Sequence, residues 1–178
     1  MKRSFDVLVA LIVGTIVAPI ALTVAIAIWL ERRGPVIIST NRVGQFGKIF
    51  KHYRFRTMAG NPLQKTRLGR LVGNLSLDDL PTLWNILIGD LSIVGPRPET
   101  PDKVDLTDLQ WQKILTVKPG LTGMAILSLR GNYNATSIQE RIEPELEYVE
   151  RQSIWLDMQL ILCTIYWWLR MGHVKGRF

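Results

Sequence analysis

The sequence is poor in the residues that build disulfides and metal clusters. It contains one cysteine, Cys163, and two histidines, His52 and His173. A single cysteine excludes an internal disulfide, and no CxxC motif or Cys/His cluster has the spacing of a zinc site. Neither histidine has a second histidine nearby, so both are interpreted as surface or packing residues. A reducing, cytoplasmic setting fits this composition best.

Acidic residues are also in deficit. The 22 Lys and Arg residues outnumber the 15 Asp and Glu residues, which gives a formal net charge of +7. Such an excess favours a polyanionic partner, which is nucleic acid, anionic lipid or a phosphorylated substrate. The sequence has no helix-turn-helix, zinc-finger or basic-aromatic RNA-binding signature, so nucleic acid is not an expected partner.

One long segment lacks charge altogether. Val7 to Leu30 is an uncharged run of 24 residues, whereas a helix needs only about 20 apolar residues to span a bilayer. Lys2-Arg3 precedes the run and Arg32-Arg33 follows it, and cytoplasmic ends of membrane segments collect Lys and Arg. Pro19 removes a helical hydrogen bond close to the midpoint. We therefore predict a re-entrant helix that bends at Pro19 and returns to the cytoplasmic face.

Two other interpretations of this segment remain at this point. A straight signal anchor would carry Pro19 as a tolerated kink. A cleaved signal peptide would use Ala25-Ile26-Ala27 as its cleavage site, although the apolar run is longer than the roughly 7 to 15 residues of a usual signal core. The chain is long enough for one domain with a core, so we expect an anchor over residues 1–33 and a cytoplasmic domain over residues 34–178.

Downstream of the anchor, the sequence pattern predicts a mostly α domain with a small β component. A β-hairpin is expected around a turn bracketed by Gly44 and Gly47. A short amphipathic helix is expected directly after Asp78-Asp79, with Pro81 in its first turn and its end near Gly89. The other predicted segments are a short buried strand, or the start of one, at Val36–Ile38 and a strand at Ile49–Phe55, a polar helix from Asp102 to about Val117, and one or two helices from Arg141 to Arg170, interrupted or opened near Pro144.

The end of that last helical region is unusually apolar. Residues 158–169 are twelve uncharged positions that include Tyr166, Trp167 and Trp168. As a helix they would extend about 18 Å, well short of a hydrocarbon core of about 30 Å, so they cannot span a membrane. One interpretation is an interfacial helix, because Trp and Tyr favour the headgroup level. The other is a buried core helix.

Two adjacent carboxylates, Asp78 and Asp79, open the predicted short helix. The free N–H groups and partial positive charge of a helix start stabilise ionised carboxylates and bound phosphates. An aspartate there can attack phosphorus while its neighbour holds a divalent metal, for which Mg²⁺ is the expected ion. The alternative is structural, because Ser76-Leu77-Asp78-Asp79 matches a capping box.

Cations accompany the acidic pair in the sequence. Lys65, Arg67 and Arg70 lie just ahead of it. Arg97 stands between Pro96 and Pro98, which hold its backbone extended and present one guanidinium rigidly. Such cations suit a phosphate site, although basic residues on solvated faces are common.

Eight short motifs follow one another along nearly the whole chain. They are Lys2-Arg3-Ser4-Phe5-Asp6, Gly34-Pro35-Val36, Arg42-Val43-Gly44, Tyr53-Arg54-Phe55-Arg56-Thr57-Met58, Ser76-Leu77-Asp78-Asp79-Leu80-Pro81, Gly95-Pro96-Arg97-Pro98-Glu99, Lys118-Pro119-Gly120-Leu121-Thr122-Gly123 and Trp155-Leu156-Asp157. In this order the chain resembles the bacterial sugar transferases, which are monotopic polyprenyl-phosphate phosphoglycosyl transferases.

The resemblance implies a re-entrant helix broken at Pro19 and a compact catalytic domain with interfacial amphipathic helices on the cytoplasmic face of the bacterial inner membrane. It also implies a two-step reaction. Asp78 would attack the β-phosphate of a UDP-sugar, release UMP and carry the phosphosugar as a covalent intermediate. A polyprenyl phosphate, expected to be undecaprenyl phosphate, would then accept that group in the first membrane step of glycoconjugate synthesis.

The same resemblance assigns roles to single residues. Asp79 takes the place of the second acidic residue, which would bind Mg²⁺ with Asp78 or activate the acceptor. Arg97 resembles the family's phosphate-binding arginine. The further family positions, expected to contact substrate, are Arg56, Arg70, Glu99, Arg130 and Asp157.

Three departures from the family pattern bear on these roles. Asp79 stands where glutamate is usual, so its carboxylate reaches about one methylene less far. Gly73 and Asn74 stand where basic residues are common. Met124-Ala125-Ile126-Leu127-Ser128 replaces a segment that commonly carries two amide side chains, which bears on sugar preference.

A second hypothesis belongs to another class of protein. A membrane-tethered basic binding module would use the acidic pair only as a helix cap, bind polyanions in a salt-sensitive way and catalyse no reaction. The transferred sugar, the glycan pathway and pairing into a homodimer are left open by the sequence.

Overall fold

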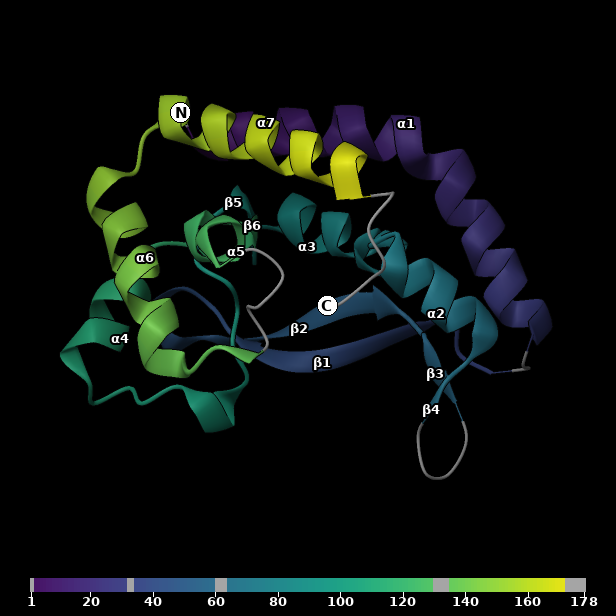
Figure 1. Ribbon diagram of the computed structural model, residues 1–178, viewed down its shortest axis with the longest axis horizontal. Helices are drawn as coiled ribbons and strands as arrows, with labels where there is room; N and C mark the ends of the chain where they lie inside the picture. The colour runs from purple at the N-terminus through teal and green to yellow at the C-terminus, as the bar shows by residue number, and fades with distance from the viewer. Residues whose placement is uncertain (1, 32–33, 60–63, 130–134, 172–178) are drawn as a thin grey trace.

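The computed structural model describes residues 2–31, 34–59, 64–129 and 135–171. These residues are mostly helical and form small two-stranded sheets, which confirms the predicted mostly α class. Helix α1 (Lys2–Glu31) and helix α7 (Ile154–Met171) lie on one side of the molecule (Figure 1). The hairpin of β1 (Ile37–Val43) and β2 (Ile49–Phe55) lies on the other, with α3 (Thr82–Ile88) between them.

Helix α1 continues without interruption through Pro19. A proline there cannot donate to the carbonyl of Thr15. The hydroxyls of Thr15 and Thr23 donate to the carbonyls of Leu11 and Pro19, each at 2.9 Å, and back-bonding of this kind bends helices. Figure 1 shows α1 turning part way along its length. The bend lies within one helix, and its return to the same membrane face stays a prediction.

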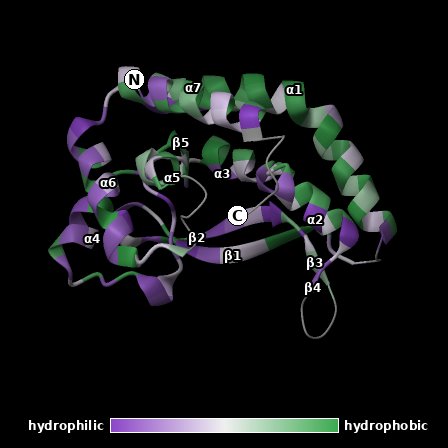
Figure 2. Ribbon diagram, in the orientation of Figure 1, coloured by the Kyte–Doolittle hydropathy of each residue, from purple (hydrophilic) through white to green (hydrophobic). Residues whose placement is uncertain are grey.

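The outer faces of α1 and α7 are apolar and exposed. Helix α1 buries only Asp6, Ala10, Val24 and Ile28, and it is the one described helix that is long and apolar enough to cross a membrane. Figure 2 shows apolar residues along both helices. The exposed ones are Leu8, Leu11, Ile12, Val13, Ile16, Ile20, Leu22, Ile26, Trp29 and Leu30 on α1, and Ile154, Trp155, Met158, Leu162, Ile165, Tyr166, Trp168 and Leu169 on α7. An exposed apolar face of this extent fits contact with lipid better than contact with water.

For α7, this exposure decides between the two interpretations made from the sequence. The helix buries Asp157 and Leu160 on its inner face. Its aromatic residues Tyr166 and Trp168 are exposed. Most of α7 is therefore exposed, as in an interfacial helix, and α7 is not a buried core helix.

The predicted hairpin is confirmed. Strands β1 and β2 pair antiparallel, with Ile37 opposite Phe55 and Val43 opposite Ile49. The expectation that the first strand is buried is wrong, because Ile37 and Ile38 are exposed. Helix α3 packs against β2 and leaves β1 at the outer edge.

Short elements complete the chain. After the hairpin come β3 (Met58–Ala59) and β4 (Gln64–Lys65), which pair antiparallel, then α2 (Arg67–Asn74) and the 3-10 turn η2 (Leu77–Asp79). Strand β5 (Ser92–Val94) pairs parallel with β6 (Gly120–Thr122). The remaining elements are the 3-10 helices η1 (Gln45–Gly47) and η3 (Pro101–Lys103) and the helices α4 (Leu109–Ile114), α5 (Met124–Ser128) and α6 (Ile138–Arg151).

The predicted helix from Asp102 to Val117 is too long. The segment forms η3 and the short α4, separated by a turn in which Asp105 Oδ1 accepts from the Thr107 N–H at 2.8 Å. Asp108 then caps α4 by accepting from Gln110 N–H at 2.9 Å. Side-chain bonds to the local backbone compete with a continuous helix here.

The predicted interruption at Pro144 is also wrong. Pro144 lies inside α6, whose inner face buries Ile142 and Tyr148, so packing offsets the hydrogen bond that proline removes. The break falls instead at Gln152 and Ser153, between the end of α6 and the start of α7. Ser153 then accepts from the Leu156 N–H at 3.1 Å at the start of α7.

One apolar cluster sets the position of α3. Phe50 of β2 and Ile86 of α3 pack with Ala10 of α1 and Leu160 of α7. Burial of such side chains contributes roughly 1.5–3 kcal/mol each. The short helix is thus fixed against both the hairpin and the membrane-facing helices, together with the turn that precedes it.

Candidate active site

The two adjacent aspartates lie on η2, directly before α3. The turn follows Ser76, whose backbone is left-handed at φ 54°. Just before it, the Trp168 indole Nε1 donates to the Leu75 carbonyl at 3.0 Å, so α7 contacts the acidic turn. The capping box predicted at Ser76 is not formed, because Ser76 makes no side-chain cap hydrogen bond.

Arg54 of β2 binds both carboxylates of the pair. Its Nη2 lies 2.7 Å from Asp78 Oδ2, and its Nε lies 2.5 Å from Asp79 Oδ1. Arg54 is not among the site residues predicted from the sequence. Side chains alternate between the two faces of β2, so Arg54 lies on the same face as His52. This alternation was the local signal in the sequence that could have identified Arg54.

Two buried polar side chains lock α3 onto β2. Thr82 Oγ1 donates to the Tyr53 carbonyl at 3.0 Å. Asn85 accepts from the Tyr53 N–H at 3.0 Å and donates to the Lys51 carbonyl at 2.7 Å. Because these bonds fix α3 to the strand, Arg54 keeps its place against the aspartates.

The two carboxylates differ in environment. Burial raises the pKa of Asp78, the charge of Asp79 raises it further, and Arg54 and Lys65 lower it. The side chain of Asp78 is 12% exposed and that of Asp79 is 34% exposed. A sheltered carboxylate with a raised pKa suits a nucleophile, and the more open one suits a metal or an acceptor group.

Further cations share the electrostatic field of the pair. Burial lowers the pKa of His52 to about 4, Asp79 opposes this shift, and Arg54, Arg42 and Arg97 reinforce it. His52 is therefore a neutral packing residue, as expected. The loop that carries Arg97 lies against the same hairpin as Arg54, because Arg42 of β1 donates to the Pro98 carbonyl at 3.2 Å.

The loop that carries Arg97 is fixed along its backbone. The Arg97 N–H donates to Glu145 Oε1 at 3.0 Å, and the Gly120 N–H donates to the Pro96 carbonyl at 2.8 Å. A Cβ on Gly120 would lie 2.1 Å from the nitrogen of Gly95, so the two segments approach too closely for any side chain. These contacts agree with the expected rigid presentation of Arg97.

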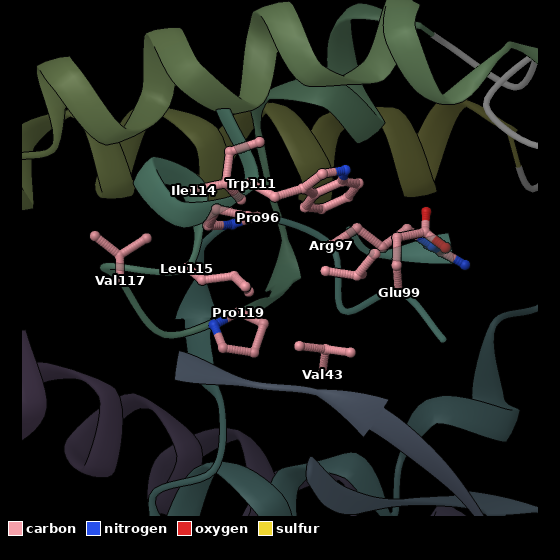
Figure 3. Close-up of a pocket in the computed structure, with 10 residues that line it drawn as sticks. Val43, Pro96, Arg97, Glu99, Trp111, Ile114, Leu115, Val117 and Pro119 are labelled. Carbon is pink, nitrogen blue, oxygen red and sulfur yellow. The ribbon is translucent and has the colours of Figure 1, made fainter. Parts of the chain in front are cut away.

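A small hollow lies beside this loop (Figure 3). Its walls come from the Arg97 loop, from α4 and from the segment before β6. The lining is apolar except for Arg97 and Glu99, and consists of Val43, Pro96, Arg97, Glu99, Val104, Trp111, Ile114, Leu115, Val117 and Pro119. A polar ligand in the hollow would meet Arg97 and Glu99.

Glu99 holds the far end of the same loop. Its buried carboxylate pairs with Arg141 Nη1 at 3.1 Å and with Lys103 Nζ at 3.9 Å. Arg42 Nη1 donates to the neighbouring Pro98 carbonyl at 3.2 Å. The geometry gives Glu99 a structural task in the loop, and its predicted contact with substrate stays a prediction.

Of two other predicted cations, Arg56 directly follows β2 and Arg70 lies on α2. The Arg56 guanidinium packs against Gly34, at the junction of anchor and domain. A Cβ added to Gly34 would lie 2.4 Å from Arg56 Nη1. Arg70 Nη1 donates to the Lys65 carbonyl at 3.3 Å, and the charge of Lys65 reaches Asp78. Arg130 lies outside the described residues.

Asp157 does not join the acidic pair. It is fully buried, its Oδ2 binds Lys2 Nζ, and its Oδ1 accepts from the Tyr148 hydroxyl at 2.7 Å. That hydroxyl also lies 3.0 Å from the Val94 carbonyl. Protein groups thus take up both oxygens of Asp157, which ties α1, α6 and α7 to the strand before the Arg97 loop.

The acidic pair fits a magnesium ion that arrives with a phosphorylated substrate. The described residues contain no cluster of three or more His, Cys, Asp or Glu that could hold a metal alone. Mg²⁺ is usually bound by one or two carboxylates together with substrate phosphates. Arg54 bonds one oxygen of Asp78 and one of Asp79, so the pair as a whole keeps an excess of negative charge.

Comparison with known proteins gives consistent matches. The family model described as bacterial sugar transferase matches residues 1–171. The UDP-N-acetylgalactosamine-undecaprenyl-phosphate N-acetylgalactosaminephosphotransferase of Aeromonas hydrophila is 34% identical over 93% of this chain and 43% of its own length. The UDP-glucose:undecaprenyl-phosphate glucose-1-phosphate transferase of Klebsiella pneumoniae is 33% identical over 93% of this chain and 39% of its own. The uncharacterized sugar transferase EpsL of Bacillus subtilis (strain 168) is 37% identical over 93% of this chain and 85% of its own length. The chain spans less than half the length of the first two relatives.

Proposed function

This chain belongs to the bacterial sugar transferase family, and we propose that it transfers a phosphosugar from a UDP-sugar to polyprenyl phosphate, releasing UMP. The observation that carries the proposal is the turn of Asp78 and Asp79, clamped by Arg54 beside the fixed loop of Arg97. The names of the relatives from Aeromonas and Klebsiella support a UDP-sugar donor and undecaprenyl phosphate as the acceptor.

In the first half-reaction, a carboxylate oxygen of Asp78 attacks the β-phosphorus of the UDP-sugar. The new oxygen–phosphorus bond forms as the bond from the β-phosphorus to the bridging oxygen breaks, and UMP leaves with that oxygen. The product is an acyl-phosphate that joins Asp78 to the phosphosugar. Arg54 holds the attacking carboxylate in place and keeps it ionised.

In the second half-reaction, a phosphate oxygen of the polyprenyl phosphate attacks the same phosphorus. The acyl-phosphate bond breaks, Asp78 returns as a carboxylate, and the lipid leaves as a polyprenyl diphosphosugar. Arg97 would bind phosphate oxygens in both steps, because its loop holds the guanidinium in one place. Asp78 and Asp79 would hold Mg²⁺, which neutralises charge on the diphosphate when bound.

The membrane arrangement supports a lipid acceptor. The exposed apolar faces of α1 and α7 lie on one side of the molecule, and α7 contacts the acidic turn through Trp168. A re-entrant α1 would place both of its basic ends and the catalytic domain on the cytoplasmic face of the inner membrane. Cysteine labelling on each side of α1 tests this topology, and reaction of one end only from outside the cell would exclude re-entry.

Turnover is tested with purified protein, undecaprenyl phosphate, Mg²⁺ and a panel of radiolabelled UDP-sugars. The wild type should release UMP and produce labelled lipid, whereas Asp78→Asn should do neither. Asp105→Asn, which changes an aspartate in a surface turn, is the matched control and should keep full activity. Full activity of Asp78→Asn would refute the assignment of the nucleophile.

The covalent intermediate is tested separately by omitting the acceptor. Intact-protein mass spectrometry should then show the wild type gaining the mass of one phosphosugar. The adduct should map to Asp78 and disappear when undecaprenyl phosphate is added. Single-turnover transfer to lipid without any protein adduct would favour direct transfer instead.

A further inference from the structure

Glu145 of α6 lies beneath the loop that carries Arg97. The residue is 5% exposed, and its Oε1 accepts from the Arg97 backbone N–H at 3.0 Å. Its Oε2 is buried and has no hydrogen-bond partner among the described residues. A buried carboxylate oxygen without a partner is costly, so Glu145 is not placed there for stability.

The surroundings of Glu145 direct it toward the loop. A Cβ on Gly123 would lie 3.9 Å from Oε2 and 2.2 Å from the Gly95 carbonyl oxygen. Glu145 thus reaches the point where the Gly95 and Gly123 segments touch. It also lines a hollow with Pro96 and Arg97 on the inner side of the loop.

An acceptor at this position limits the movement of Arg97. Pro96 and Pro98 have no backbone N–H, so neither neighbour of Arg97 can donate a backbone hydrogen bond. The Arg97 N–H is therefore the one backbone donor of these three residues, and Glu145 accepts from it.

We propose that Glu145 is a positioning residue, which fixes the Arg97 loop from inside and thereby sets the affinity of the site for the diphosphate of the donor. The inference rests on the proposed function, because it assigns Arg97 to the donor phosphates. Glu145 itself does not contact substrate. It acts through the backbone of Arg97.

The test compares variants of the full-length protein by their affinity for UDP, measured by titration calorimetry, and by their kinetics with the UDP-sugar. Glu145→Leu removes the acceptor and should weaken UDP binding by about tenfold and raise KM more than it lowers kcat. Glu145→Gln keeps a carbonyl oxygen for the Arg97 N–H and should bind UDP within about threefold of the wild type. Ile142→Val, on the same buried face of α6, controls for packing and should leave the affinity unchanged.

A double-mutant cycle shows whether Glu145 acts through Arg97. Combining Glu145→Leu with Arg97→Ala should weaken UDP binding no more than Arg97→Ala does alone, because the positioned guanidinium is already missing. Additive losses, or wild-type affinity in Glu145→Leu, would overturn the inference. If Glu145→Leu does not fold, a loss of UDP affinity in folded Glu145→Gln as large as that of Arg97→Ala would overturn it instead.

Failure of the wild type to turn over any UDP-sugar would count against the proposed function, whereas an active wild type with an unaffected Glu145→Leu variant would count against this inference alone.

Discussion

Two carboxylate centres in this protein are each paired with a cation from a distant part of the chain, yet they are built differently. Asp157 pairs with Lys2, and its side chain is 1% exposed. Asp78 and Asp79 share Arg54, and Asp79 keeps an open side toward solvent. The first centre joins one anion to one cation, whereas the second joins two anions to one cation.

This difference separates a structural tie from the candidate active site. Both oxygens of Asp157 bond to protein groups, Lys2 and Tyr148, inside the core. The acidic pair carries one more negative charge than Arg54 neutralises, and it borders solvent and further cations. Excess charge and access are what a metal-bound diphosphate requires. Four changes can break or sharpen this contrast, from the largest expected effect to the smallest.

Asp78→Asn should have the largest effect, and on activity alone. Transfer should fall by at least about 10³-fold, which corresponds to roughly 4 kcal/mol of transition-state stabilisation. The Tm should change little, because the substitution removes charge from a pair that already has an excess of it. UMP release and thermal unfolding in detergent measure the two quantities. A large fall in Tm would show that the acidic pair is also a structural tie.

Asp157→Asn should show the opposite pattern. It leaves the Lys2 ammonium without its buried counter-ion, so the free energy of unfolding should fall by about 3 kcal/mol. Thermal unfolding measures the loss. Glu147→Gln, which breaks the exposed pair with Arg151, is the control and should change stability by less than about 1 kcal/mol. An unchanged Tm in Asp157→Asn would contradict the structural role.

Glu145→Gln should change how stability depends on pH. Burial raises the pKa of Glu145 to about 7, the charge of Arg97 lowers it, and that of Glu99 raises it. A carboxyl with a raised pKa contributes stability that is complete below its unfolded pKa of about 4.5 and is lost as pH rises through 7. The wild type should therefore lose roughly 2 kcal/mol between pH 5 and pH 8, and Glu145→Gln should lose less. Equal slopes in the Tm of the two proteins against pH would show that Glu145 does not titrate in this range.

Arg54→Gln should shift the pH dependence of transfer. Asp78 attacks as a carboxylate, and the charge of Arg54 lowers the pKa of Asp78. Without that charge, activity should be lost at a higher pH on the acid side of the profile. Transfer at pH 7 should fall by roughly tenfold through loss of the charged hydrogen bonds. Arg151→Gln, on the surface of α6, should leave the profile unchanged.

Much of the fold follows from local patterns that the sequence carries. The long uncharged run made α1 predictable, and the glycines that bracket its turn made the β1-β2 hairpin predictable. Gly89 ends α3 as predicted, but the helix begins at Thr82, after Pro81, and Asp78-Asp79 form a separate 3-10 turn. The failures lie where local capping bonds or tertiary packing overrode the pattern, as at Asp108 and at Pro144 inside α6.

The sequence by itself determined the apolar anchor, the adjacent aspartates and the proline-flanked Arg97, because each is a property of neighbouring residues. Only the tertiary structure decided which groups serve the acidic pair. Arg54 meets Asp78 across 24 positions, and Glu145 meets Arg97 across 48. Asp157, predicted as a substrate contact, pairs with Lys2, 155 positions away. Residues so far apart in the sequence produce no periodic pattern that would predict their contact. The contact depends on how α3, β2 and α6 pack together.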